Sequence, residues 1–465
     1  MGAFSFLDRS HSVANPGFSR WLVPPAALCI HLCIGQAYAF SVFNKPLGQL
    51  LCAAQSACPD ATSKVISTTP GDWTIANLGW IFSLAIVCLG LSAAIFGRWV
   101  ESAGPRAAMF ASASLFCGGL IVAGLGVSIH NLPIVFLGYG VIGGCGLGIG
   151  YISPVSTLIK WFPDRPGLAT GTAIMGFGGG ALIGAPLAVA LMKHYSSATS
   201  NGVAPTMITM GIIYFIYMVV GAMIVRIPAP GWKPEGYVAP VTAQKLITTG
   251  NVLVAEAIKT PQFWLLWGVL FLNVTAGIGV LGQASLMIQE MFGVAAAAAA
   301  GFVGLLSLFN MGGRIVWAST SDYIGRKNTY FIFFALGAVL YALVPTFGHL
   351  LAIVPFVLAY GIILSMYGGG FATIPAYLRD LFGTAQVGAI HGVLLTAWAA
   401  AGVAGPVLVN YIRQYQIDHG VAKADAYSVT MYIMAGLLVI GFICNYLVTP
   451  ISQKYFASNL QEATT

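Results

Sequence analysis

Long apolar runs dominate the chain, and polar residues gather in the short connections between them. Each run is long enough for one α-helix to cross the hydrocarbon core of a bilayer, which is about 30 Å thick. Twelve such runs stand out, at residues 21–44, 75–97, 106–128, 132–159, 167–192, 204–227, 262–286, 299–320, 328–347, 350–376, 387–411 and 428–448. Backbone polar groups in lipid must be satisfied within helices or closed barrels. The pattern therefore predicts an all-α integral membrane protein with twelve transmembrane helices.

Two short polar segments repeat each other at a spacing of about half the chain. The first reads Gly97-Arg-Trp-Val-Glu101-Ser-Ala-Gly104-Pro-Arg106, and the second reads Ala318-Ser-Thr-Ser-Asp322-Tyr-Ile-Gly325-Arg326-Lys327. Such a repeat predicts two related six-helix halves, which is typical of a membrane transporter with a site between its halves. We therefore expect an N-terminal half at 1–227, a cytoplasmic linker at 228–261 and a C-terminal half at 262–465.

Composition and charge agree with a membrane protein. Only 7% of the residues are charged and 58% are hydrophobic, so a soluble core cannot account for the chain. If both termini are cytoplasmic, most lysines and arginines fall in the inner connections, as the positive-inside rule requires. The net charge of +7 is then a signal of topology, and we expect no nucleic-acid partner.

Motifs of other protein classes are missing from the sequence. It holds no G-x-x-x-x-G-K-[ST] phosphate loop and no H-E-x-x-H pair, and its cysteines lack zinc-ribbon spacing. We therefore expect no enzyme activity, no cofactor and no metal. Cys52 and Cys58 share the first predicted outer connection, and their spacing leaves open whether they form a disulfide. The first apolar run is too long for the core of a cleavable signal, so we expect it to stay as a helix.

The repeated acid-x-x-Gly-x-Arg pattern, after the second and eighth runs, resembles the signature of the major facilitator superfamily. Glu101 replaces the usual aspartate in the first copy, and Ala318 replaces the leading glycine in the second. A charged turn of this kind can pair with neighbouring helix ends and close the cytoplasmic side. The expected cytoplasmic gate consists of Gly97, Glu101, Gly104, Arg106, Asp322, Gly325 and Arg326.

Several further stretches resemble the oxalate/formate antiporter family, which is related to the monocarboxylate transporters. They are Tyr38-Ala-Phe-Ser-Val-Phe43, Trp161-Phe-Pro-Asp-Arg-Pro-Gly167, Gly176-Phe-Gly-Gly-Gly180, Asn310-Met-Gly-Gly-Arg314 and Thr396-Ala-Trp398. The resemblance implies transport of a small organic anion and says little about which one.

One basic residue lies deep inside a predicted span. Arg314 precedes Asp322 by eight residues, which places it roughly 12 Å into the membrane. An arginine there costs about 2.5–3.5 kcal/mol, so it needs a partner, and no acid lies inside the spans. A carboxylate substrate would supply that partner, because guanidinium grips two oxygens at once. The alternative is that Arg314 snorkels to the cytoplasmic face or caps helix carbonyls.

Aromatic and amide side chains near the middle of the spans are candidates for the rest of the site. Tyrosine hydroxyls can donate to a carboxylate, while the rings exclude water. The predicted substrate-binding residues are Arg314, Tyr38, Tyr151, Tyr367, Phe371, Trp398, Asn273, Gln283 and Asn310. Gln36 is a further polar residue of the first span, and packing between helices explains such amides equally well. His31 and His391 could carry a proton or serve as packing residues.

The resemblance also bears on substrate charge. Oxalate-specific members of the family carry a lysine where this chain has Trp398 and a second arginine where Ser307 aligns. One fixed positive charge suits a monoanion, so we expect a monocarboxylate of the lactate, pyruvate or formate type.

The coupling mode stays open between three alternatives. Monocarboxylate transporters pair the arginine with an acid and carry a lysine in the first helix, whereas this chain has Asn310 and Val42 there. These replacements favour anion exchange over proton symport or downhill passage. A membrane sensor that binds an organic acid without transporting it is the rival from another class. The expected setting is a prokaryotic inner membrane, with lipid and a small carboxylate as the only partners of a monomer.

Overall fold

The computed structural model describes residues 5–48, 73, 75–197, 200–237, 246–281 and 283–457. Within these ranges the named elements are all helical, and the only β pairing is two isolated bridges. Twelve helical segments are long and apolar enough to cross a membrane. The prediction of an all-α protein with twelve transmembrane helices is confirmed. Cys52 and Cys58 lie outside the described residues.

The first six spans are built from eight α-helices, two 3-10 helices (η3 and η4) and one π-helix (η5). They comprise η3 (Arg20–Leu22), α1 (Val23–Ile34), η4 (Gly35–Ala39), α2 (Ser41–Gly48), α3 (Ile75–Ala103), α4 (Pro105–Ser128), α5 (Leu132–Val135), η5 (Phe136–Gly143), α6 (Gly144–Trp161), α7 (Pro166–Tyr195) and α8 (Val203–Ile224). After a short helix, α9 (Val254–Ala257), the last six spans comprise α10 (Pro261–Leu281), α11 (Ala284–Phe292), α12 (Ala296–Ile324), α13 (Arg326–His349), α14 (Ile353–Phe382), α15 (Val387–Leu394), α16 (Thr396–Asp418) and α17 (Ser428–Leu447).

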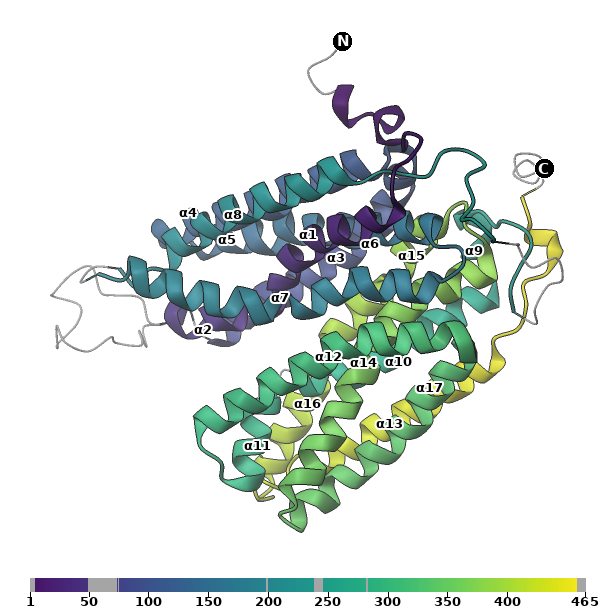
Figure 1. Ribbon diagram of the computed structural model, residues 1–465. Helices are drawn as coiled ribbons and strands as arrows, with labels where there is room; N and C mark the ends of the chain where they lie inside the picture. The colour runs from purple at the N-terminus through teal and green to yellow at the C-terminus, as the bar shows by residue number, and fades with distance from the viewer. Residues whose placement is uncertain are drawn as a thin grey trace.

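The helices form two bundles that lean against each other at one end (Figure 1). Helices α1 to α8 make one bundle and α10 to α17 make the other, and the ribbons converge near α15 and diverge toward α2 and α11. The described part of the chain begins and ends beside the convergent end, which we call the termini end; the opposite one is the far end. The main packing between the bundles joins α7 to α12 and α3 to α15 and α16.

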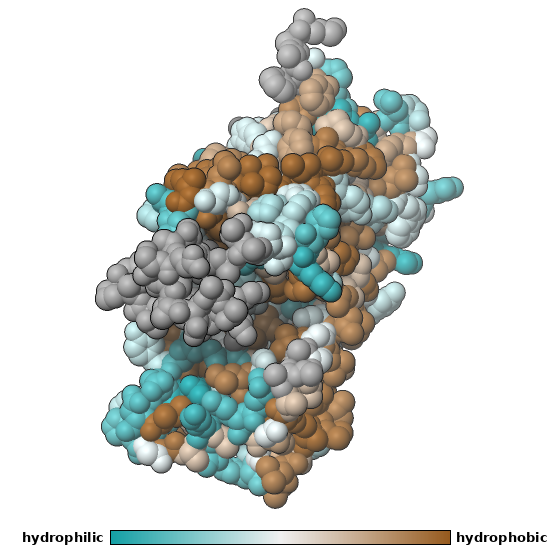
Figure 2. Space-filling view, turned by 90° about the vertical axis from the view of Figure 1, so that its left-hand side faces the viewer, coloured by the Kyte–Doolittle hydropathy of each residue, from teal (hydrophilic) through white to brown (hydrophobic). Residues whose placement is uncertain are grey.

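The outer surface is that of a protein immersed in lipid. Large apolar side chains are exposed on helices of both bundles, among them Ile95, Leu125, Ile216, Val354 and Ile443. Figure 2 looks onto the far end and shows hydrophobic residues along the flanks, with hydrophilic ones gathered on the face toward the viewer. This distribution matches helices that cross a bilayer with their ends in water.

Helices α3, α12 and α14, which end at the termini end, extend beyond the apolar runs that predicted them. The sequence places span ends at 97, 320 and 376, whereas α3 continues to Ala103, α12 to Ile324 and α14 to Phe382. Most of the expected gate therefore lies in helix rather than in loop. Only Gly104 and Gly325 break the chain there, with φ angles of 87° and 86° that favour glycine. Hydropathy falls where charged residues begin, but backbone hydrogen bonding continues for another turn or more.

Candidate functional site

Arg314 lies at the interface between the bundles, on the face of α12 that meets α7. Its side chain is fully buried, and its Nε donates to Oδ1 of Asn310 (3.2 Å) one turn earlier on the same helix. Its Nη1 donates to the carbonyl of Ile174 on α7 (3.3 Å), while Nη2 has no partner. No carboxylate pairs with Arg314 in the described part of the chain. The bonds to neutral groups leave its charge uncompensated.

A cluster of aromatic rings from both bundles surrounds Arg314. The guanidinium carbon lies 5.4 Å from the ring centre of Phe371 and 5.9 Å from that of Phe177, at cation–π distance. Trp398 contacts four rings, with centroid distances of 4.5 Å to Phe371, 5.3 Å to Tyr151, 5.4 Å to Phe177 and 6.5 Å to Tyr38. These rings form an aromatic box around the guanidinium. In such low-dielectric surroundings the electrostatic attraction between the guanidinium and an anion is strong.

Tyr38 and Tyr367 join the bundles on the far-end side of Arg314. Their hydroxyls are 3.3 Å apart, so the first span bonds to the tenth. Tyr367 lies fifteen residues before the end of α14 and Arg314 ten before the end of α12, roughly 22 Å and 15 Å from the termini end. The tyrosine pair therefore covers the arginine from the far end.

Unpaired polar atoms converge on this cluster. Nη2 of Arg314, the hydroxyl of Tyr151 and Nε1 of Trp398 are all buried without a hydrogen bond of good geometry, although the Tyr151 hydroxyl lies near the guanidinium. Buried polar groups in folded proteins are almost always paired, and each unpaired one costs about 1–3 kcal/mol. Three such groups, each able to donate a proton, on side chains that pack together around one cation, make a site with the donors that an anion requires.

The predicted amides divide into two groups. Asn310 bonds to Arg314, and Asn273 is buried in a small cavity that also includes Tyr367, with its Nδ2 unpaired. The structure does not bring Gln283 to the cluster, because its side chain donates to Asn410 (2.6 Å) between α10 and α11. Gln36 accepts from the hydroxyl of Tyr139 (3.3 Å) within the first bundle, which is the packing use of an amide.

The acids of the repeated segments each cap a helix of the opposite bundle. Both oxygens of Asp322 accept from backbone amides at the start of α7, those of Gly167 and Leu168, at 2.9 Å. Glu101 accepts from the amide of Gly388 at the start of α15 (3.1 Å) and pairs with Lys160 (2.5 Å). A carboxylate at a helix N-terminus is favourable, because unpaired amides and the helix dipole both attract it. These caps hold the bundles together at the termini end.

The basic residues of the two repeats are used differently. Arg326 bonds to Asp322 and Ser321 on α12 and to Asp380 on α14 (3.2 Å). Arg106 instead donates to the carbonyl of Phe6 (2.9 Å) in the N-terminal segment. Gly97 packs so closely on α15 that a Cβ atom there would lie 2.8 Å from Cα of Ala389. The sequence repeat therefore gives equivalent acids but not equivalent arginines.

Replacing Asp322 by Asn should loosen the termini end. The amide nitrogen cannot accept from the start of α7, and Arg326 loses one of its two carboxylates. Hydrogen bonds to charged groups contribute about 1.5–3 kcal/mol each, so we expect lower thermal stability and a larger separation of the bundles at this end. Electron-resonance distances between spin labels at the exposed positions Ser102 and Lys259 would measure the separation. Lys259→Gln is the matched control for stability, since its exposed pair with Glu256 contributes little. Unchanged label distances in Asp322→Asn would contradict the role of this cap.

Comparison with known proteins decides the family. Residues 26–406 match the model of the Major Facilitator Superfamily. The chain belongs to the major facilitator superfamily. It is 30% identical over 335 residues to the oxalate:formate antiporter of Oxalobacter formigenes, covering 71% of this chain and 75% of that protein. It is 22% identical over 505 residues to apicoplast pyruvate carrier 1 of Toxoplasma gondii, covering 91% and 88%.

Solved structures agree on the fold of this superfamily member. The superfamily transporter FucP in its outward conformation superposes with a TM-score of 0.62 at 14% identity, covering 93% of this chain and all of FucP. The human organic anion transporter MFSD10 superposes with a TM-score of 0.65 at 14% identity, covering 93% and 100%. The superfamily match, the related transporters and the twelve spans together make the protein a multi-pass membrane transporter and not an enzyme.

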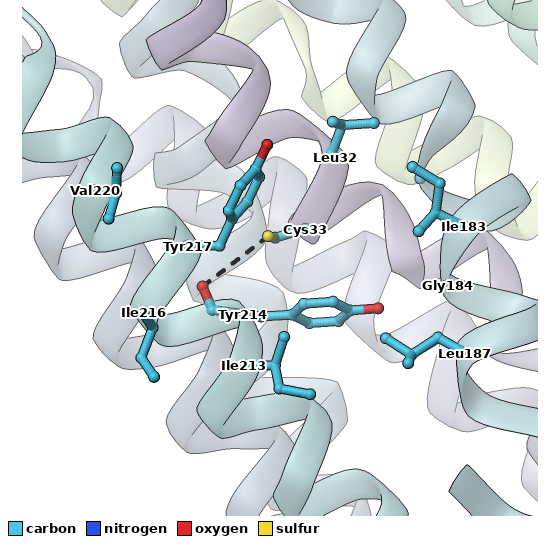
Figure 3. Close-up of a pocket in the computed structure, with 11 residues that line it drawn as sticks. Leu32, Cys33, Ile183, Gly184, Leu187, Ile213, Tyr214, Ile216, Tyr217 and Val220 are labelled. Atoms are coloured by element: carbon cyan, nitrogen blue, oxygen red, sulfur yellow. Dashed lines mark hydrogen bonds between the residues drawn. The ribbon is translucent and has the colours of Figure 1, made fainter. Parts of the chain in front are cut away.

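A large pocket of this transporter lies away from Arg314, between α1, α7 and α8 (Figure 3). It has a volume of about 520 Å³ and is lined by Leu32, Cys33, Gly180, Ile183, Gly184, Leu187, Ile213, Tyr214, Ile216, Tyr217 and Val220. Ile183 and Ile216 are more than half exposed on the outer surface, and the thiol of Cys33 donates weakly to the carbonyl of Tyr214 (4.0 Å). No charged group lines the pocket, so it offers nothing to hold an anion.

Sequence reasoning missed two residues of the cluster around Arg314. Phe177 forms one wall of the box, and Gly178 leaves the space that Arg314 fills, since a Cβ atom there would lie 2.7 Å from Nε of Arg314. Both lie in the glycine-rich stretch 176–180, where an aromatic residue between glycines was the available signal.

Proposed function

We propose that this transporter carries a small monocarboxylate by alternating access of two six-helix halves, 1–227 and 262–465, around Arg314. The termini are cytoplasmic in this proposal, the membrane is a prokaryotic inner membrane, and the working unit is a monomer. One anion is exchanged for another across the membrane.

The observation that carries the proposal is the state of Arg314. The guanidinium is fully buried, has no carboxylate partner in the described residues and keeps Nη2 unpaired. An isolated buried charge is strongly unfavourable unless it is paired. A carboxylate that enters from the far end would pass the hydrogen bond between Tyr38 and Tyr367. It would then pair with the free edge of the guanidinium. The hydroxyl of Tyr151 and the indole N–H of Trp398 would donate to its oxygens.

The charge of the site supports a monoanion. Arg314 is the only lysine or arginine that contacts the ring cluster in the described chain. Trp398 contributes a neutral ring to that cluster, and the hydroxyl of Ser307 donates to the carbonyl of Val303 (3.1 Å) on its own helix. One fixed cation balances one carboxylate. The names of the relatives include formate and pyruvate, which are monocarboxylates, as well as oxalate.

The contacts between the bundles support alternating access. The caps made by Glu101 and Asp322 close the termini end, and the bundles diverge toward the far end (Figure 1). With cytoplasmic termini the capped end is the cytoplasmic one, and breaking the caps would open the path inward. Exchange is the proposed mode because an unpaired Arg314 at the interface between the halves hinders the empty carrier from reorienting, and a bound carboxylate relieves this.

Counterflow into proteoliposomes tests the proposal. Vesicles preloaded with one unlabelled acid would be offered labelled formate, lactate, pyruvate, acetate or oxalate, with protein-free vesicles as the control. We expect a monocarboxylate to accumulate in preloaded vesicles and to enter empty ones far more slowly. A preference for oxalate would contradict the charge argument, and equal uptake into empty vesicles would contradict exchange. No uptake of any acid would favour a binding sensor.

A further inference from the structure

His31 lies on α1, next to the proposed anion site, and its ring is placed between α6 and α7 of the same bundle. Its Nδ1 lies 2.8 Å from the carbonyl oxygen of Ala173 on α7, and its Nε2 lies 3.2 Å from that of Tyr151 on α6. The side chain is fully buried, and its ring lies 5.5 Å from the ring of Tyr151, which is part of the cluster around Arg314. The imidazole therefore has two acceptors and no donor among its partners.

This arrangement suits only one protonation state of the ring. A neutral imidazole carries one N–H and one lone pair, so it can donate to one carbonyl and must turn its lone pair toward the other. An imidazolium carries two N–H groups and can donate to both. The geometry is built in by close packing, since a Cβ atom at Gly176 of α7 would lie 3.0 Å from Cβ of His31. The carbonyls thus form a clamp for a proton-bearing ring.

The charged and titratable groups around His31 come from three helices, with Tyr151 on α6, Arg314 on α12 and His391 on α15. Helix α7 contributes the carbonyl of Ala173. The titratable groups near α1 on α4 and α8, which are Cys117, Tyr214 and Tyr217, lie around Cys29 and Cys33 instead. Burial of the ring opposes a proton on His31 most strongly, and the charge of Arg314 adds to that opposition. No carboxylate of the described chain bonds to either side chain.

We propose that His31 is a proton site coupled to the anion site, which takes up a proton when a carboxylate pairs with Arg314. The inference rests on the proposed function. A bound carboxylate neutralises the guanidinium and removes its repulsion, while the carbonyls of Ala173 and Tyr151 offset the cost of burying the imidazolium. The lone pair of one ring nitrogen takes up a proton that the buffer releases, and the proton returns to the buffer when the anion leaves. No bond within the anion changes.

Coupling of this kind is reciprocal. If the anion strengthens proton binding at His31, the proton strengthens anion binding by the same factor, so the anion binds more tightly at low pH. Coupling between two sites is typically 5- to 150-fold, and we expect the dissociation constant to fall by about tenfold between pH 8 and pH 5.5. His31 would then bind the proton in place of the acidic side chain that this chain lacks at Asn310.

Calorimetry on the detergent-purified protein tests the coupling directly. The acid found by counterflow would be titrated at one pH in two buffers of different ionisation enthalpy. The difference in heat gives the number of protons taken up per anion. We expect between zero and about one proton to be taken up per anion bound near pH 7, and a value measurably above zero. Anion binding with the same heat in both buffers would overturn the inference and leave the proposed function intact. No binding of any acid would overturn both.

Two asparagine variants locate the proton. Asn places its amide near the Nδ1 position of His31, so His31→Asn can still donate to Ala173 but cannot take a proton. We expect this variant to bind the anion with equal heat in both buffers and with an affinity that no longer depends on pH. The matched variant is His391→Asn, which removes a buried imidazole whose two nitrogens have no partner. It should keep the proton uptake. Loss of uptake in His391→Asn with retention in His31→Asn would assign the proton to His391 and overturn the inference.

Discussion

Arg314→Lys should lose nearly all transport while the protein still folds. Lysine keeps the positive charge but presents a single ammonium instead of a planar fork, so it cannot match the two oxygens of a carboxylate. It also loses the geometry that bonds Nε to Asn310 and Nη1 to the carbonyl of Ile174. Disrupting a buried charged hydrogen-bonded pair costs about 2–5 kcal/mol, so we expect a fall in exchange rate of roughly 30-fold or more. The measurement is counterflow of the preferred acid, normalised to the amount of protein in the vesicles.

The control for this substitution is Arg98→Lys. Arg98 is an exposed arginine of α3 near the termini end, outside the ring cluster, so its replacement should leave exchange within about twofold of the parent. Thermal unfolding of both variants separates folding from function. If Arg314→Lys exchanges as fast as the parent protein, the guanidinium does not bind substrate, and the search moves to Tyr151, Trp398 and Asn273.

The fold could be predicted because its signals are local in the sequence. A membrane span depends on the apolar content of about twenty consecutive residues, and each of the twelve runs contains its own evidence. Arg314 stood out for the same reason, since one arginine in an apolar run needs no partner in the sequence to be noticed. The acids Glu101 and Asp322 were marked by repetition. Their partners, the first turns of α15 and α7, could not be predicted, because caps between helices depend on how the bundles meet.

The rest of the site depends on geometry that one sequence does not hold. Gln283 and Asn310 are both amides in predicted spans, yet only Asn310 reaches Arg314, because it lies four residues earlier on the same helix. The face that a residue presents depends on where its helix starts and breaks, and the seventh span breaks between α10 and α11. The sequence could not predict the two carbonyl acceptors of His31, since these are backbone atoms of other helices.

Gly178→Ala should reduce transport strongly with little loss of stability. Gly178 lies on the face of α7 that meets α12, and a Cβ atom would come within 2.7 Å of Nε and 3.2 Å of Cδ of Arg314. The clash falls on a long side chain rather than on backbone, so the protein can relieve it by turning the guanidinium away. That movement breaks the bond to Asn310 and displaces the charge from the box of Phe177 and Phe371. Misplacing a binding group by about 1 Å can cost on the order of 100-fold in rate.

A matched control lies two residues before the arginine itself. Gly312→Ala adds the same methyl group to α12, but no atom lies within 4 Å of that position. Alanine also has a higher helix propensity than glycine, so this control should exchange normally and melt at the same or a slightly higher temperature. The two variants differ only in whether the methyl group touches Arg314. Loss of exchange in Gly178→Ala alone would show that the empty space at Gly178 positions the guanidinium. Equal behaviour of the two variants would mean that Arg314 tolerates displacement, which a site built around one fixed cation should not.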